Sequence, residues 1–439
     1  MIILKFGGTS VGSVERIREV ANLSNNTQRK VVVLSAMSGT TNSLIEIAEY
    51  LYKKNHDSAN EAINKLELNY YEVTNKLFST TEYKKKGIDL IQSHFSHIKS
   101  FTQDMFTLFE EKAILAQGEL ISTALLHYYF NEQKIESVLI PALNFMRTDK
   151  DGEPDLFYIK ENINREIDLH PNNTIFITQG FICRNAFGEI DNLRRGGSDY
   201  TASLVGVACE AEEIQIWTDI DGMHNNDPRF VENTTPLSNL SFDEAAELAY
   251  FGAKILHPAS IQPCKVANVP VRLKNTLEPK ALGTLISSKV NGSGIKSIAA
   301  KDRITAIKIK SGRMLLAHGF MRKVFEIFET YKTSIDMITT SEVAVSVTID
   351  DTKYLNDIVD ELKKYGTVEI DKDLSIICVV GDFIAESKGY AFRVMESLQN
   401  ISIRMISYGG SRHNVTLLVN TSDKKEALNS LHQNLFNRV

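Results

Sequence analysis

Two glycine pairs in this chain stand beside charged side chains that could bind an anion. Lys5 lies two residues before Gly7-Gly8, and Arg195 directly precedes Gly196-Gly197, which is followed closely by Asp199. Glycine has no Cβ, so backbone N–H groups next to it can turn towards a phosphate or carboxylate and approach it closely. Lysine supplies a point charge, whereas arginine supplies a planar two-pronged donor that matches a carboxylate. The first pair therefore predicts a phosphate site, and the second predicts a site for an anionic substrate.

A second set of polar residues lies beside apolar runs. Ser35 and Thr41 belong to a segment of small hydroxyl and amide side chains that follows one such run, and Thr218-Asp219 ends another. Open α/β sheets bind ligands beyond the carboxyl ends of their strands, although a helix N-cap is the alternative for the first segment. Glu119 lies in the apolar stretch 113–126. Its burial would be costly without a cationic partner, whereas a surface position on an amphipathic helix is the alternative.

These residues need a scaffold, and the pattern of residues 1–285 supplies one. Apolar runs alternate with amphipathic segments, which is typical of a largely parallel sheet covered by helices. Between residues 43 and 132 the pattern is continuously helical and predicts a helical insertion over one end of the sheet. The strand candidates are Ile2 to Phe6, Val31 to Ser35, Ser137 to Ile140, Thr174 to Thr178 and Ile214 to Thr218.

The last third of the chain contains an internal repeat. A break rich in glycine, serine and asparagine at 289–297 indicates a linker. Beyond it, the segment that starts at Gly319-Phe320 is echoed seventy positions later by Gly389-Tyr390. Each copy reads strand, helix, strand, strand, helix, which is a ferredoxin-like order. We therefore expect a catalytic domain at 1–288 and a regulatory region at 289–439, with units at about 300–372 and 373–439 or interleaved.

Taken together, the motifs resemble the aspartokinases of the amino acid kinase family. The resemblance covers nearly the whole chain and rests on the opening segment 5–12, on 35–42, on 195–201, on 217–229 and on 251–258. It implies an α/β fold, with an αβα sandwich built on a mainly parallel sheet and followed by two ferredoxin-like (βαββαβ) ACT domains. It also implies an enzyme that transfers phosphate from ATP, with Mg²⁺, to the β-carboxylate of L-aspartate, the first step of lysine, threonine and methionine biosynthesis.

The resemblance also assigns roles to single residues. The catalytic residues would be Lys5, Lys254 and Asp199, and no residue is assigned to a metal. ATP and its phosphates would be bound by Lys5, Gly7, Gly8, Thr218, Asp219, Arg229 and Lys254. Aspartate would be bound by Ser35, Thr41, Glu119, Phe181, Arg195, Gly196 and Ser198.

Two departures from the family pattern concern the substrate sites. Relatives usually carry tyrosine at a nucleotide-binding position where this chain has His224, so the resemblance assigns no nucleotide contact to His224. Relatives also usually have Asp-Ala-Arg where this chain has residues 142–144, to which we assign no catalytic role.

The first repeat unit predicts regulation by L-lysine. Free backbone N–H groups at a helix start, Gly319-Phe320, can hold an amino acid's carboxylate. The first unit has Asp336 where the second has Arg404, and two acids, Asp336 and Glu342, suit a cationic ligand. The alternative is that these acids cap loops or pair across a dimer interface. With the resemblance to lysine-sensitive aspartokinases, the predicted site comprises Met314, Gly319, Phe320, Met321, Ser334, Asp336, Thr340, Ser341 and Glu342.

Composition narrows the choice of partners and compartment. The 439 residues carry a net charge of −6 and no basic block, so we expect no nucleic acid partner. We also expect no membrane span, a cytoplasmic protein with reduced core cysteines, and His94 and His97 as surface residues. The tandem ACT-like units predict a homodimer or a dimer of dimers. Another amino-acid kinase, or a sensor built on an inactive kinase lobe, are the rival interpretations.

Overall fold

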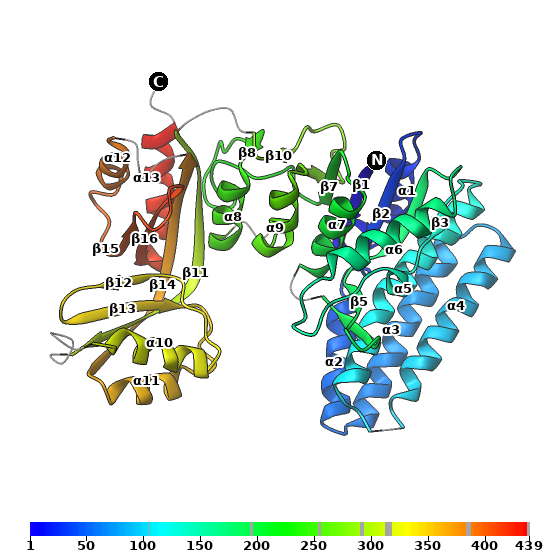
Figure 1. The fold of residues 1–439 in the computed structure, drawn as a ribbon, viewed down its shortest axis with the longest axis horizontal. Coiled ribbons are helices and arrows are strands. Elements are labelled where there is room, and N and C mark those ends of the chain that lie inside the picture. The colour runs from blue at the N-terminus through cyan, green and yellow to red at the C-terminus, as the bar shows by residue number, and fades with distance from the viewer. Residues whose placement is uncertain are drawn as a thin grey trace. The chain divides into compact units, whose positions relative to one another are not determined.

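The computed structural model describes residues 1–103, 105–193, 196–252, 256–289, 294–311, 318–382 and 388–436. The chain forms two compact units (Figure 1). Unit 1 comprises Met1–Met223, Ser238–Phe242 and Ile255–Val290, and unit 2 comprises His224–Leu237, Asp243–Lys254 and Asn291–Val439. Two segments of the predicted catalytic stretch 1–288, at 224–237 and 243–254, therefore group with the C-terminal part of the chain.

Unit 1 contains a mainly parallel sheet, as predicted. Within the described residues its eight strands follow the order β3-β4-β2-β1-β7-β9-β10-β8, and β10 runs antiparallel to β9. Because β1, β2 and β4 are buried on both faces, they read in the sequence as continuous apolar runs. The strands are β1 (Ile2–Phe6), β2 (Lys30–Leu34), β3 (Val138–Leu139), β4 (Ile175–Gln179), β7 (Glu213–Thr218), β8 (Asn239–Leu240), β9 (Val271–Asn275) and β10 (Thr284–Ile286).

Helices cover both faces of this sheet. Residues Ile17 and Val20 of one helix share a core with Leu4 on one face, whereas Gly206 of another packs against Ile3 on the opposite face. The predicted αβα sandwich is confirmed. The helices around the sheet are α1 (Val14–Ser24), α6 (Leu156–Asp168), α7 (Gly197–Ala208) and α9 (Pro258–Ala267), and a separate hairpin joins β5 (Ile182–Arg184) to β6 (Ile190–Asn192).

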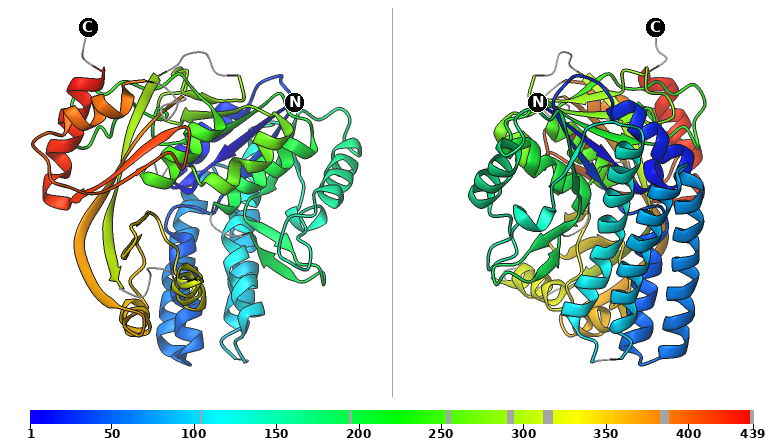
Figure 2. Two further views of the ribbon diagram at one scale, coloured as in Figure 1. Left: turned by 60° about the vertical axis from the view of Figure 1, so that its left-hand side comes forward. Right: turned by 90° about the vertical axis from the view of Figure 1, so that its right-hand side faces the viewer.

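The predicted helical insertion is a bundle that extends away from the sheet (Figure 2). Its interior, with Tyr70, Phe95 and Ile121, is continuous with the apolar residues of one sheet face. The helices approach closely at Gly87, where a Cβ would lie 2.5 Å from Thr74 Cγ2. The bundle helices are α2 (Thr40–Tyr52), α3 (His56–Leu77), α4 (Thr81–Ser100) and α5 (Leu108–Glu132).

Unit 2 is built on an antiparallel sheet. Its six strands, counted over the part of the chain that the structure describes, follow the order β12-β13-β11-β14-β16-β15. The strands are β11 (Gly294–Lys310), β12 (Ile338–Thr340), β13 (Ala344–Ile349), β14 (Thr367–Asp382), β15 (Ile403–Tyr408) and β16 (Asn414–Asn420). The helices are α8 (Phe242–Phe251), α10 (Phe320–Thr330), α11 (Leu355–Lys363), α12 (Tyr390–Ser397) and α13 (Lys424–Phe436).

The two ferredoxin-like halves share the long central strands β11 and β14. Ile307 pairs with Val347 and Ile370 in the first half, whereas Ala299 pairs with Cys378 in the second. The N-terminal part of β11 therefore belongs to the sheet of the second half, whereas its C-terminal part belongs to the first. The two halves are interleaved in sequence. The prediction of a linker at 289–297 is wrong from Gly294 onwards, because residues from Gly294 pair with β14 and form the start of β11. Residues 290–293 lie outside the described residues.

The repeat is also visible in the backbone. Gly319 and Gly389 precede α10 and α12 with φ values of 83° and 85°. This left-handed conformation is unfavourable for residues with a Cβ, so glycine recurs at equivalent positions. Within the described residues, none of the helices has the length and apolar character needed to cross a membrane.

Candidate active site

The carboxyl ends of four neighbouring strands bring the predicted substrate residues to one edge of the sheet in unit 1. In the order β4-β2-β1-β7, these ends carry Phe181, Ser35, Lys5 and Thr218. Parallel pairing fixes this arrangement, since Lys5 is opposite Val33 on one side and Ile216 on the other. The sheet edge is where open α/β folds bind ligands.

The loop after β1 leaves little room for side chains at its glycines. A Cβ at Gly8 would lie 3.1 Å from the carbonyl oxygen of Ala36, and one at Gly7 would lie 3.3 Å from Lys5 Nζ. The chain then makes a short 3₁₀ helix, η1 (Gly8–Val11), before α1 begins at Val14. This short turn separates the glycine loop from α1.

Lys5 forms an ion pair with Asp199. Lys5 Nζ lies 2.7 Å from Asp199 Oδ1, and the side chains are only 11% and 13% exposed. Asp199 is in the first turn of α7, where the helix dipole stabilises a carboxylate. The pair holds the ammonium at the mouth of the glycine loop. The second predicted lysine, Lys254, lies outside the described residues.

The second glycine pair lies at the start of α7. Gly196 has a φ of 73°, and a Cβ there would lie 2.5 Å from Ser260 Oγ. Phe181 adopts the left-handed region at φ 67°, which is rare for a residue with a Cβ and marks a constrained position. The hydroxyl of Thr201 accepts a hydrogen bond from the Phe181 amide at 3.0 Å, and Ser198 packs against Gly180. Arg194 and Arg195 lie outside the described residues.

Glu119 is buried, and no ion pair to it is seen among the described residues. It lies in α5 against the loop that follows β2, where its neighbour Gly118 packs on Ala36. Burial raises the pKa of the Glu119 carboxyl to about 7, although the Ala36 amide and nearby Lys5 act in the opposite direction. The burial of Glu119 excludes the alternative that it lies on the surface of an amphipathic helix. A buried carboxyl of this kind would gain most from a cationic ligand group.

A buried polar network that the sequence analysis missed supports Glu119. Gln179, at the end of β4, donates to Thr123 at 2.8 Å, and Thr123 donates to the Glu119 carbonyl at the same distance. The other end of Gln179 accepts from the Ala142 amide. The sequence feature that could have revealed this network is the occurrence of polar residues, such as Gln179 and Thr123, inside apolar runs. Ser122, one residue before Thr123, donates to the Ser35 carbonyl and ties α5 to the substrate loop.

The predicted nucleotide residues are divided between the two units. Thr218 ends β7 in unit 1, and its hydroxyl donates to Asp219 at 3.1 Å. Arg229 belongs to unit 2, where it is 72% exposed and pairs with Asp227 at 2.6 Å. His224, also in unit 2, contacts the Thr234 hydroxyl. The contacts of these residues with a nucleotide stay predictions.

The predicted effector residues occupy unit 2. Asp336 is the most deeply buried of the acids, and its Oδ1 contacts Lys301 Nζ at 2.7 Å and the Tyr250 hydroxyl at 2.9 Å. Burial raises the pKa of the Asp336 carboxyl, against the opposing effect of Lys301. Met314 lies outside the described residues. Phe320 is buried and Met321 is half-buried, whereas Gly319, Ser334, Thr340, Ser341 and Glu342 are exposed.

Other features of the surface and interior do not coincide with this site. Among the described residues no group of three or more histidine, cysteine or acidic side chains is arranged to hold a metal, and the four cysteines are free.

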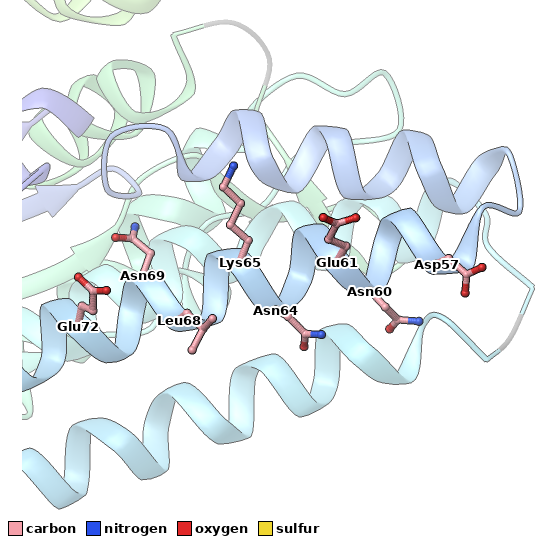
Figure 3. A pocket seen from close by; sticks show the side chains of 8 residues that line it. All are labelled: Asp57, Asn60, Glu61, Asn64, Lys65, Leu68, Asn69 and Glu72. Atoms are coloured by element: carbon pink, nitrogen blue, oxygen red, sulfur yellow. The ribbon is translucent and has the colours of Figure 1, made fainter.

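The prediction that His94 lies on the surface was wrong, because His94 is half-buried with its Nδ1 2.6 Å from Gln117 Oε1. A groove on α3 (Figure 3) is lined by Asp57, Asn60, Glu61, Asn64, Lys65, Leu68, Asn69 and Glu72.

Comparison with known proteins places this architecture in a family. The amino acid kinase family model matches residues 1–275, and an ACT domain model matches residues 377–435. Lysine-sensitive aspartokinase 3 of Escherichia coli is 32% identical over 460 residues, with 99% of both chains covered. Aspartokinase 1, chloroplastic, of Arabidopsis thaliana is 33% identical over 462 residues, which cover 99% of this chain and 80% of the plant protein.

Two crystal structures of E. coli aspartokinase III are similar over the whole chain. Each is 31% identical to this chain, superposes with a TM-score of 0.85 and covers 99% of this chain. The match covers 100% of the chain in the complex with aspartate and ADP, and 99% of the chain in the complex with lysine and aspartate. The fold and the sheet-edge site define an amino acid kinase. Within that class the chain belongs to the aspartokinases, the kinases that phosphorylate the side-chain carboxyl group of aspartate.

Proposed function

We propose that the sheet-edge site binds aspartate and the phosphates of ATP through the residues that the strand ends gather. The observation that carries this proposal is that two kinds of group lie at the same sheet edge: the buried Glu119, which forms no ion pair among the described residues, and the buried Lys5–Asp199 ion pair. One group suits an ammonium, and the other suits an anion. An amino acid substrate and a phosphate donor need both.

On the aspartate side, Glu119 would bind the substrate ammonium, and Ser35, Thr41 and Ser198 would contribute polar contacts. Arg195 would bind a carboxylate, with Gly196 and Phe181 shaping the backbone around it. The network from Gln179 through Thr123 fixes the backbone of Glu119 and so limits its movement. Fixed donors and acceptors of this kind hold the attacking carboxylate in place.

On the phosphate side, one β-carboxylate oxygen attacks the γ-phosphorus while the bond to the β,γ-bridging oxygen breaks, which gives 4-phospho-L-aspartate and ADP. No general base is required, because neutral pH lies well above the carboxyl's reference pKa of about 3.9 and the carboxylate is therefore already ionised. Lys5, Lys254 and the Gly7 and Gly8 amides would offset the charge that shifts to ADP. Thr218, Asp219 and Arg229 would contact the nucleotide.

Mg²⁺ fits this site as a partner of the nucleotide rather than of a protein cage. Among the described residues no acidic cluster could enclose it, so the phosphate oxygens of ATP and water would supply most of its ligands. When bound there, Mg²⁺ neutralises triphosphate charge.

We further propose that L-lysine inhibits the enzyme by binding at the first ACT unit. The E. coli relative is named lysine-sensitive, and one of its structures is described as a complex with lysine and aspartate in the T-state. Asp336 and Glu342 would meet the cationic groups of lysine, and the helix start at Gly319-Phe320 would meet its carboxylate. We also propose a cytoplasmic enzyme that dimerises through its ACT units, in which the second unit either binds a ligand or only joins subunits.

A hydroxamate assay tests the proposed reaction. Purified protein with ATP, Mg²⁺ and L-aspartate should release ADP and form aspartyl hydroxamate when hydroxylamine traps the acyl phosphate. Lysine should suppress this signal, whereas threonine and methionine should not. Product with glutamate and none with aspartate would contradict the assignment of aspartate as the substrate. Inhibition by threonine alone would contradict the assignment of lysine as the effector.

A further inference from the structure

The carboxylate of Asp336 is crowded at one oxygen and unsatisfied at the other. Oδ1 is contacted by Lys301 Nζ at 2.7 Å and by the Tyr250 hydroxyl at 2.9 Å. Its side chain is only 1% exposed, and Oδ2 is buried with no hydrogen-bond partner among the described residues. A buried acceptor without a donor costs free energy, so this carboxylate would gain from one more donor.

The surrounding groups also favour an added cation. Lys301, on β11, contacts Asp350 Oδ2 at 2.9 Å as well as Asp336, and its ammonium lies 4.8 Å from the centre of the Tyr250 ring. The cluster thus contains two acids and one lysine, all within unit 2. Its formal charge of about −1 would be balanced by one further ammonium group.

Tyr250 connects this cluster to a different part of the sequence. It is the last residue but one of α8, and its ring packs edge-on against Phe251 with centroids 5.0 Å apart. Lys254, a predicted phosphate-binding residue, follows four positions later. The hydrogen bond to Asp336 therefore ties the end of the helix that precedes Lys254 to the predicted effector acid.

We propose that the Tyr250 hydroxyl competes with the ammonium group of the effector for Asp336. The inference rests on the proposed regulation by lysine. A bound ammonium withdraws negative charge from the carboxylate and weakens the hydrogen bond that Tyr250 donates to it. Coupling between two groups on one acceptor is reciprocal, so effector binding releases the end of α8, and an intact Tyr250 contact opposes effector binding.

Competition predicts opposite effects for the two partners of this hydrogen bond. Removing the Tyr250 hydroxyl removes a competitor and strengthens inhibition by lysine. Removing the Asp336 carboxylate removes the acceptor and weakens inhibition by lysine. If Tyr250 only held Asp336 in place for the effector, both substitutions would weaken inhibition.

The test is Tyr250→Phe, which keeps the ring and removes only the hydroxyl. The lysine concentration for half-maximal inhibition of aspartate-dependent ADP release, and the lysine Kd from calorimetry, should both fall about fivefold or more. Tyr331→Phe is the matched control, because Tyr331 lies in the same unit and, among the described residues, its hydroxyl forms no hydrogen bond with Asp336. It should leave both values unchanged. Unchanged or raised values in Tyr250→Phe would overturn the competition.

Two further measurements separate the possible failures. If the parent enzyme neither binds lysine nor is inhibited by it, the proposed regulation fails before any variant is compared, and the inference falls with it. If Tyr250→Phe does not fold, Lys301→Gln replaces the ammonium that competes at the same oxygen with a neutral amide and should shift both lysine values in the same downward direction. A rise or no change in that variant would overturn the proposal.

Discussion

Glu119 and Asp336 are both buried acids proposed to bind the ammonium group of an amino acid, but the protein treats them differently. Burial raises the pKa of Glu119 to about 7, and no basic side chain among the described residues forms an ion pair with it. The Asp336 side chain is also buried, but it already contacts Lys301 and Tyr250. The substrate acid is thus left for its ligand, whereas the effector acid has partners that a ligand must share or displace.

The difference teaches how each site would control affinity. At Glu119 no basic side chain among the described residues forms an ion pair, so a proton is the competitor expected for the carboxylate and substrate binding should depend on pH. At Asp336 the competitors belong to the protein, so effector binding should depend on the contacts of unit 2. An effector changes activity only by its different affinity for two states, and protein contacts at its own site provide such a difference.

The largest effect expected is in the substrate region, where Lys5→Ala should lower kcat by roughly 10² or more. The substitution leaves Asp199 buried without its cation and removes charge from the phosphate loop. Turnover is measured at saturating ATP and aspartate, with lysine absent. Lys301→Gln is the counterpart in the effector region, and its kcat should stay near that of the parent. Near-normal turnover in Lys5→Ala would remove Lys5 from the mechanism.

Asp336→Ala should affect only the effector region. We expect the lysine concentration for half-maximal inhibition to rise by about 30-fold or more, because loss of a buried charge partner costs a few kcal/mol. The kcat and the KM for aspartate should match the parent. Parallel loss of catalysis and inhibition would indicate a folding defect and would contradict a separate effector acid.

The pH dependence of aspartate binding should follow Glu119. Its ionised form binds the substrate ammonium, so the KM for aspartate should rise by about tenfold for each pH unit below the carboxyl's pKa of about 7. The raised pKa also means that Glu119 stabilises the free enzyme most at low pH, and this contribution is lost as pH rises from 4.5 to about 7. A KM that is constant from pH 6 to pH 8 would exclude this titration.

Glu342→Ala should give the smallest effect. Glu342 is exposed, and exposed charges interact weakly because water screens them. We therefore expect the half-inhibitory lysine concentration to rise only by about two- to fivefold. A desensitisation as large as that of Asp336→Ala would show that Glu342, and not the buried acid, is the main anchor.

Much of the scaffold could be predicted from local pattern. Strands such as β1 and β4 are buried on both faces and are therefore continuous apolar runs ending near glycine. The tandem units were visible because Gly319 and Gly389 both need a left-handed backbone. The resemblance in motifs then indicated which strand ends carry chemistry.

The remaining features depend on pairings between distant residues. Asp336 meets Lys301 and Tyr250, which are 35 and 86 positions away, and no local pattern encodes that contact. Gly294 lies in a segment whose composition suggests a linker, yet its pairing with β14 makes it part of a strand. His94 looked like a surface residue because its partner, Gln117, comes from another helix.

The most direct test of this account is Glu119→Gln, assayed for both substrate and effector responses. The variant keeps the size of the side chain and one acceptor oxygen, but an NH2 donor replaces the second oxygen and the side chain cannot carry the charge that pairs with an ammonium. We predict that the KM for aspartate rises by about 10², loses its pH dependence, and leaves the fractional inhibition by saturating lysine unchanged. A KM near that of the parent, or a loss of lysine inhibition with the KM unchanged, would contradict the assignment of Glu119 to the substrate.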